Sequence, residues 1–160
     1  MTSWAEFADA VPELAGRVEE RFSATGLVAV GTLRRDGWPR VSPVEPLITG
    51  GQLYLGMMWQ SRKALDLLGD PRCVVHTAIA DSSGSEGDGK VYGRAVDVVD
   101  PDERDAYGRA LEAAIGWRPT GPFHLFRIAI AEVAWVLLGE GPREVLRWEP
   151  GRPLQNLDAP

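Results

Sequence analysis

The chain has 160 residues, of which 44% are hydrophobic, and this is enough for one domain with a proper core. Its formal net charge of −6 at pH 7 argues against binding nucleic acid or an anionic membrane through a broadly basic face, so any anion must be bound locally. The single cysteine, Cys73, excludes an intrachain disulfide and a multi-cysteine metal site. Since no stretch reaches the roughly 20 apolar residues of a membrane span and no signal peptide is evident, we expect a cytoplasmic protein.

Residues 1–24 predict two N-terminal helices. Ser3 and Glu6 have the spacing of a capping box, and apolar residues recur at helical spacing from Phe7 to Phe22. Pro12 falls inside this pattern and is expected to divide it into a short helix and a longer one.

Three antiparallel strands are expected between residues 26 and 59. An Asp-Gly turn joins the strand 26–33 to the strand 39–47, and a Gly-Gly turn leads into the strand 52–59. Side chains alternate between the two faces of a strand, so Arg40 and Ser42 lie on the same face of the second one.

The third strand leads directly into a helix that starts with Ser61, Arg62 and Lys63. Ser61 is a good N-cap, but the first turn then carries two cations where the helix dipole favours acids. Two adjacent cations beside free backbone N–H groups are suited to holding a phosphate or carboxylate. The alternative is two solvated surface cations.

The second half of the chain continues this strand-rich pattern. We expect strands at 73–80 and 90–99, separated by a flexible polar loop at 81–89, then a helix from Asp100 to Ile115, a bent strand at 123–138, a turn at 139–142 and a strand at 145–148. We therefore predict one mainly β (α+β) domain over residues 1–148, with six or seven antiparallel strands closed into a barrel and peripheral helices. Residues 149–160 are expected to be a loosely held tail.

Other motifs favour no common catalytic class. The segment 84–91 nearly matches a phosphate loop, but Val91 replaces the required hydroxyl and a strand follows, although Lys90 can still point into a nearby site. His76 and His124 are the only histidines; His76 is expected in the core or at an interface, and no metal site is predicted. Acidic residues on the expected helices, including Asp66 and Glu103, are expected on solvated faces.

Arg40 is a second candidate anion ligand. We expect a hairpin that pairs the second strand with the third to bring Arg40 towards Arg62 and Lys63. A dianionic phosphate can use a bidentate arginine, a lysine and a hydroxyl together. Trp59, Trp117 and Trp135 can pack on a planar ring or in the core.

Several segments resemble the pyridoxamine 5′-phosphate oxidase-like split barrels, a family that includes flavin and deazaflavin-dependent reductases. They are the segment 37–44, the strand 53–58, the Ser-Arg-Lys-Ala segment 61–64 with 67–72, and more faintly 126–128 with Trp135. The resemblance implies a six-stranded antiparallel split β-barrel that forms a homodimer, with the phosphate of FMN bound at the subunit interface.

The resemblance also implies site residues. Arg40 is similar to the family's strand-two arginine near the phosphate, Arg62 and Lys63 to its phosphate-clamping pair, and Trp135 to the tryptophan beside the flavin. Gly56 and Met57 fall where the oxidases have a Tyr-Thr pair. A further set of positions departs from the oxidase pattern, with Glu45 near the place of a lysine and 144–148 lacking the Arg-Leu-His of the substrate site, so a true pyridoxamine phosphate oxidase is not expected.

The leading hypothesis is therefore an FMN-dependent oxidoreductase acting on a small organic molecule, with no catalytic residue assigned. The candidate cofactor-binding residues are Arg40, Ser42, Met57, Ser61, Arg62, Lys63, Lys90 and Trp135. A deazaflavin coenzyme is an alternative, with Arg34, Arg35 and Lys90 as extra cations for its longer polyanionic tail. A binding protein without turnover, or a haem protein with His76 or His124 as axial ligand, are further alternatives.

Overall fold

The computed structural model describes residues 1–139 and 141–158, so the expected turn at residue 140 and the last two residues of the tail lie outside it. The helices are α1 (Trp4–Ala10), α2 (Pro12–Thr25), α3 (Arg62–Gly69) and α4 (Pro101–Ile115). The strands are β1 (Val28–Leu33), β2 (Pro39–Val44), β3 (Pro46–Thr49), β4 (Gln52–Met58), β5 (Arg72–Thr77), β6 (Asp88–Asp97), β7 (Phe123–Leu137), β8 (Glu144–Trp148) and β9 (Gln155–Asn156).

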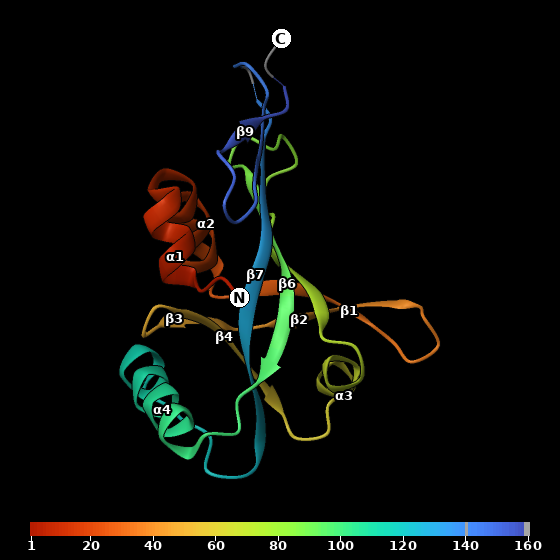
Figure 1. The fold of residues 1–160 in the computed structure, drawn as a ribbon, viewed down its shortest axis with the longest axis vertical. Coiled ribbons are helices and arrows are strands. Elements are labelled where there is room, and N and C mark those ends of the chain that lie inside the picture. Colours follow the sequence, from red (N-terminus) through yellow and green to blue (C-terminus); the bar gives the residue numbers. More distant parts are fainter. Residues whose placement is uncertain (140, 159–160) are drawn as a thin grey trace.

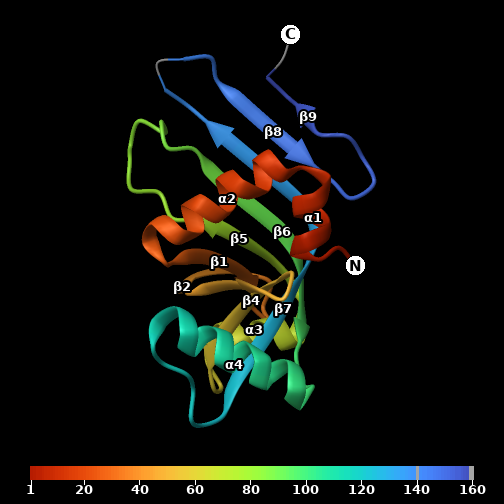
Figure 2. The same ribbon diagram turned by 90° about the vertical axis from the view of Figure 1, so that its left-hand side faces the viewer.

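The strands form one antiparallel sheet whose ends are joined by the chain itself. Their order is β2-β1-β5-β6-β7-β4-β3, with β8 paired to β7 and β9 to β8. β2 and β3 lie at opposite ends of this order, yet only Glu45 separates them in sequence, so the sheet must curve until its ends meet. The predicted antiparallel barrel is confirmed, and the strand count is higher because the second predicted strand is divided into β2 and β3 and because the tail adds β9, which pairs with β8 beyond the barrel (Figure 2).

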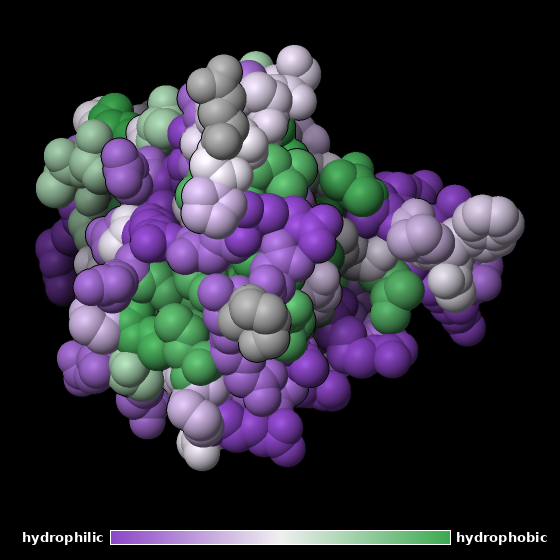
Figure 3. All heavy atoms as spheres, turned by 90° about the horizontal axis from the view of Figure 1, so that it is seen from above, coloured by the Kyte–Doolittle hydropathy of each residue, from purple (hydrophilic) through white to green (hydrophobic). Residues whose placement is uncertain are grey.

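The second predicted strand is divided because Pro46 has no N–H to donate to a continuous ladder. β2 pairs with β1, which places Arg40 opposite Thr32, whereas only β3 pairs with β4. The expectation that one hairpin carries Arg40 alongside the third strand is therefore wrong. The β1–β2 hairpin instead projects from the side of the barrel, as Figures 1 and 3 show.

Local sequence signals fix the ends of the helices. The Glu6 N–H donates to the Ser3 hydroxyl (3.2 Å) and the Ser3 N–H donates to the Glu6 carboxylate (2.7 Å), which confirms the capping box. Asp100 caps α4, and Gly116 ends it in the left-handed conformation. The tail contains β9, so part of it pairs with β8.

The core lies between the barrel and the N-terminal helices. α1 and α2 cover one side of the sheet, and α4 lies near β3 and β4 at the other end (Figure 2). Phe7 and Val18 from the two helices are fully buried together with barrel residues such as Leu53 and Ile128. Among the described residues, no helix is both long enough and apolar enough to cross a membrane. Burial on this scale supplies most of the folding free energy, at about 25 cal/mol per Å².

Candidate functional site

The candidate site is built on the turn between β4 and α3. Gln60 in this turn takes a left-handed conformation (φ 57°), and the Ser61 N–H donates to the Met58 carbonyl (3.1 Å). Ser61 is the N-cap of α3, but its hydroxyl makes no capping bond and is buried without a partner in the described part of the chain. A buried hydroxyl beside the free N–H groups of a first helical turn is an arrangement that an anion would complete.

Arg62 and Lys63 flank this N-terminus on two sides. Successive helical residues are about 100° apart, so the two side chains leave the helix in different directions. Arg62 is exposed and lines a cavity under the β1–β2 hairpin. Lys63 is half-buried, lines a different cavity, and donates from Nζ to the Pro43 carbonyl (3.2 Å). The two cations therefore border two cavities that share the start of α3.

Arg40 reaches α3 but is held by an acid there. Its Nε donates to Asp66 Oδ2 (2.6 Å), which also accepts from the Thr32 hydroxyl (2.9 Å). Thr32 is 2% exposed and the Asp66 side chain 9%, so this network is largely shielded from water. The expectation that Asp66 lies on a solvated face is wrong. Arg40 borders the same cavity as Arg62 with its charge already paired.

The first cavity has a volume of about 1100 Å³ and is rich in arginine. Its charged lining residues are Arg34, Arg35, Arg40, Arg62, Arg72, Asp36, Asp66 and Asp70. Each of the three aspartates pairs with one arginine, and the Arg72 guanidinium lowers the pKa of Asp70 to about 2. Arg35 and Arg62 have no carboxylate partner within residues 1–139 and 141–158, so the cavity has a net positive charge suited to an anion.

The second cavity, of about 620 Å³, lies on the other side of the start of α3 and is mainly apolar and aromatic. The residues that matter most for its chemistry are Glu45, Gly56, Met57, Trp59, Lys63, Tyr107, Trp117 and Phe123. They come from the β2–β3 link, the end of β4, the β4–α3 turn, α3, α4, and the segment from α4 into β7. This is the setting that a planar ring prefers.

Four of the predicted cofactor-binding residues line neither of these cavities: Ser61, which precedes Arg62 and Lys63 at the start of α3, and Ser42, Lys90 and Trp135, which lie away from both cavities. Ser42 is half-buried on β2 opposite Val30 and does not line either cavity. Lys90 on β6 is bonded to Asp88. Trp135 on β7 is 4% exposed and lines a third cavity of about 370 Å³ beside α2. Within one chain, the structure thus brings Arg40 near Arg62, and Met57 near Lys63, but leaves Ser42, Lys90 and Trp135 apart from them.

The two histidines differ in what their rings can reach. His124 is 6% exposed and stacks on Trp59 (ring centroids 4.5 Å apart), with its Nε2 buried and unpartnered in the described structure. His76 is half-buried; its Nδ1 bonds the Thr77 carbonyl (2.6 Å) and its Nε2 lies 3.5 Å from the Asp88 carboxylate. No group of three His, Cys, Asp or Glu residues in the described chain is placed to hold a metal ion.

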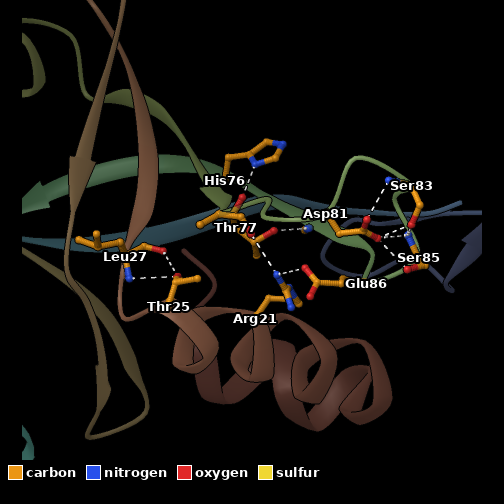
Figure 4. Close-up of polar contacts among 11 residues, drawn as sticks. Arg21, Thr25, Leu27, His76, Thr77, Asp81, Ser83, Ser85 and Glu86 are labelled. Carbon is orange, nitrogen blue, oxygen red and sulfur yellow. Dashed lines mark hydrogen bonds and ion pairs between the residues drawn. The ribbon is translucent and has the colours of Figure 1, made fainter.

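The loop that follows β5 is closely bonded (Figure 4). The carboxylate of Asp81 accepts from the Ser83 hydroxyl, from the Ser83 N–H (2.9 Å), and from the hydroxyl (2.7 Å) and N–H (3.2 Å) of Ser85. These bonds, and the one from the Ser83 hydroxyl most of all, lower the pKa of Asp81. Arg21 on α2 donates to the Glu86 carboxylate (2.7 Å). The contacts of Arg21 tie the polar loop to α2 (Figure 4).

The sequence reasoning missed two residues of the candidate site. Asp66 follows Arg62 by one helical turn, and that spacing indicates only that the two share a face. Tyr107 on α4 reaches the second cavity, with its hydroxyl 2.4 Å from the point where a Cβ on Gly56 would lie. The one available signal was Gly56 itself, because a glycine within a strand marks a close approach of another group.

Comparison with known proteins places this geometry in context. The family model described as "Pyridoxamine 5′-phosphate oxidase" matches residues 14–136. No curated protein matches the sequence.

Solved structures show the same fold at low sequence identity. A haem-binding protein from Mycobacterium smegmatis is 21% identical with a TM-score of 0.61, the match covering 81% of this chain and 56% of that one. A protein related to general stress protein 26 from Clostridium acetobutylicum is 12% identical (TM-score 0.63; 82% and 91% covered). PhzG from Burkholderia lata, solved in complex with tetrahydrophenazine-1-carboxylic acid, is 15% identical (TM-score 0.58; 96% and 86% covered). This chain thus spans little more than half the length of the Mycobacterium protein.

Proposed function

Since the chain belongs to the pyridoxamine 5′-phosphate oxidase family, we propose that it binds FMN and acts as an oxidoreductase on a small organic molecule. The observation that carries this proposal is the buried, unpartnered Ser61 hydroxyl at the N-terminus of α3, where the next two residues, Arg62 and Lys63, line a cationic cavity and an aromatic one respectively. A phosphorylated ring compound needs a cationic environment for its phosphate and an aromatic one for its ring. The residues present therefore fit the cofactor.

In this proposal the start of α3 holds the phosphate. The Ser61 hydroxyl and the free N–H groups of the first turn donate to it, and Arg62 and Lys63 neutralise its charge from either side. Arg40 contributes only indirectly, because Asp66 already engages it. Met57 and Trp59 offer apolar surface for the ring.

When bound, the flavin accepts and donates electrons and hydride, which is chemistry that side chains do not supply. The chain's own part is to orient the ring and exclude water from it. Trp59 is suited to this because its stack on His124 fixes the indole at the cavity wall. No acid–base side chain is obligatory for hydride transfer, which agrees with the absence of a triad motif in the sequence.

The deazaflavin coenzyme remains the alternative on the same fold. It carries a longer anionic tail, and the two arginines without carboxylate partners in the described chain, Arg35 and Arg62, both line the larger cavity. Lys90, proposed from the sequence as a third cation, lies outside this cavity.

Haem binding is a second candidate, favoured by one observation. The His76 Nδ1–H donates to the Thr77 carbonyl, so Nε2 is the ring atom that would bind iron, and an iron ion there would take the place of the Asp88 carboxylate that lies 3.5 Å from it. The similar Mycobacterium protein is named as haem-binding. His124 is the poorer axial ligand because Trp59 covers it. Haem gives a Soret band that should be lost in His76→Ala, whereas FMN gives a yellow spectrum.

We also propose a homodimer with the cofactor at the interface, as the family resemblance implies. Neither Trp135 nor Lys90 lies near α3 of its own chain, so in this proposal they would approach the cofactor from the second copy. A cytoplasmic location and a small-molecule substrate belong to the same proposal.

Titration of the purified protein with FMN tests the proposal. Arg62→Ala and Lys63→Ala should each weaken binding by about 1–3 kcal/mol through lost charge-assisted hydrogen bonds. Arg109→Ala is the matched control, because Arg109 pairs with Asp105 on the exposed face of α4 and lines neither cavity. Unchanged affinity in both α3 variants would remove the site assignment.

A further inference from the structure

Tyr107 places a hydroxyl inside the second cavity that the protein itself does not use. The residue is 4% exposed and lines the cavity, and its hydroxyl makes no hydrogen bond to any described residue. It sits directly over Gly56, where any side chain would displace it. A tyrosine hydroxyl is protonated at neutral pH and can donate, and burial and the nearby Glu45 charge raise the pKa of Tyr107 to about 12, so this donor also persists at alkaline pH.

The walls around this hydroxyl are aromatic and partly rigid. Trp59, Trp117 and Phe123 line the cavity, and Trp59 is fixed by its nearly parallel stack on His124 (11° between the ring planes). Phe123 packs beside Tyr107 with ring centroids 6.1 Å apart. Flat walls of this kind favour a planar guest.

The charges at the cavity disfavour an anionic guest. Glu45 lines it and acts electrostatically on Tyr107. The one lysine there, Lys63, already donates to the Pro43 carbonyl and stands at the α3 end of the cavity, where the proposed cofactor phosphate is bound. A negative group beside Tyr107 would thus meet the Glu45 carboxylate, while the charge of Lys63 would be neutralised by the cofactor phosphate.

We propose that the part of the second cavity around Tyr107, next to the space at the Trp59 and Met57 wall that the flavin ring would occupy, is the substrate pocket, that it takes a small planar molecule with a carbonyl or ring-nitrogen acceptor and no negative charge, and that Tyr107 donates the hydrogen bond that orients it. The identification of that molecule as the substrate rests on the proposed function. Tyr107 is a specificity-determining residue in this scheme, and Glu45 rejects anionic analogues.

Three naphthalene probes of similar size, measured by isothermal titration calorimetry on the purified protein, separate the effects of the hydrogen-bond acceptor, the apolar ring and a negative charge on affinity. They are 2-acetylnaphthalene, which has the acceptor; 2-ethylnaphthalene, which lacks it; and 2-naphthoate, which is anionic. Wild-type protein should bind the ketone about tenfold more tightly than the hydrocarbon, as expected for one hydrogen bond, and should bind the naphthoate most weakly.

Tyr107→Phe should remove the preference for the ketone without changing the affinity for 2-ethylnaphthalene, and Glu45→Gln should strengthen naphthoate binding. Tyr92→Phe is the control, since Tyr92 is 39% exposed on β6 and outside the cavity. Gly56→Ala, which displaces the hydroxyl without deleting it, should also reduce the ketone preference. Melting temperatures confirm that each variant is folded.

The inference is overturned if the ketone does not bind, if it binds no better than the hydrocarbon, or if Tyr107→Phe retains the preference. A parallel FMN titration separates this result from the proposed function. FMN binding without ketone selectivity contradicts only the substrate pocket, whereas Tyr107-dependent ketone binding without FMN binding supports the pocket and contradicts the flavin proposal.

Discussion

Replacing Asp66 with asparagine tests the network that holds Arg40 against α3. Asparagine preserves the shape of the side chain but loses the charge that accepts from the Arg40 Nε (2.6 Å) and the Thr32 hydroxyl (2.9 Å). A charge-assisted hydrogen bond contributes about 1.5–3 kcal/mol when shielded. Since the Arg40 side chain is 30% exposed, we discount this to about 1–2 kcal/mol for screening by solvent.

For a domain of this size, such a loss lowers the melting temperature by about 3–6 °C, measurable by circular dichroism. The variant also frees Arg40 in the cavity that it shares with Arg62, so FMN affinity should rise several-fold while stability falls. Asp105→Asn is the control, because its pair with Arg109 is exposed and should change stability by less than about 0.5 kcal/mol. Equal melting temperatures for the two variants would refute the reasoning.

Three other outcomes are expected. Gly87→Ala should lower the melting temperature more than Gly37→Ala. Both residues have positive φ, but only the Cβ added at residue 87 would meet another side chain, Trp135, at 2.2 Å. Similar melting temperatures for the two variants would show that this clash with Trp135 is unimportant. Burial raises the pKa of the Cys73 thiol to about 12, so Ellman's reagent should not label it at pH 8 until guanidinium unfolds the chain, and rapid native labelling would contradict its burial. Burial and a hydrogen bond to a carboxylate raise the pKa of Tyr54 from 10.0 to about 12, so unfolded chains lose this proton first as the pH rises. The free energy of unfolding should therefore fall between pH 10 and pH 12. Denaturant titrations should show a smaller fall in Tyr54→Phe, and an equal fall in the two proteins would be evidence against the shift.

Features with a local cause could be predicted from the sequence. The Ser3 capping box, the division of the first helix at Pro12 and the cap at Asp100 all depend on residues within one helical turn of each other. The barrel followed from the alternation of strands and short turns. The position at which the barrel closes, Glu45, could not be predicted, because β2 and β3 look like one continuous strand in the sequence until their different partner strands are known.

The candidate site was harder to predict because long-range packing decides it. Arg40 and Asp66 are 26 residues apart, and periodicity cannot say that they meet. Glu103 was likewise expected in solvent, yet it accepts from the Tyr54 hydroxyl (2.8 Å) and from Arg127 (2.9 Å). The family resemblance indicated which residues would bind the phosphate, but only the folded structure shows that Arg62 and Lys63 border separate cavities.

In the proposed function, the start of α3 holds the phosphate of a flavin. Comparing the affinities of the purified protein for FMN and for riboflavin, which has the same ring without the phosphate, tests this most directly. Loss of two charge-assisted hydrogen bonds predicts that riboflavin binds about 100-fold more weakly, with the difference largely abolished in the Arg62→Ala, Lys63→Ala double variant. Equal affinities of the wild-type protein for FMN and riboflavin would contradict the account.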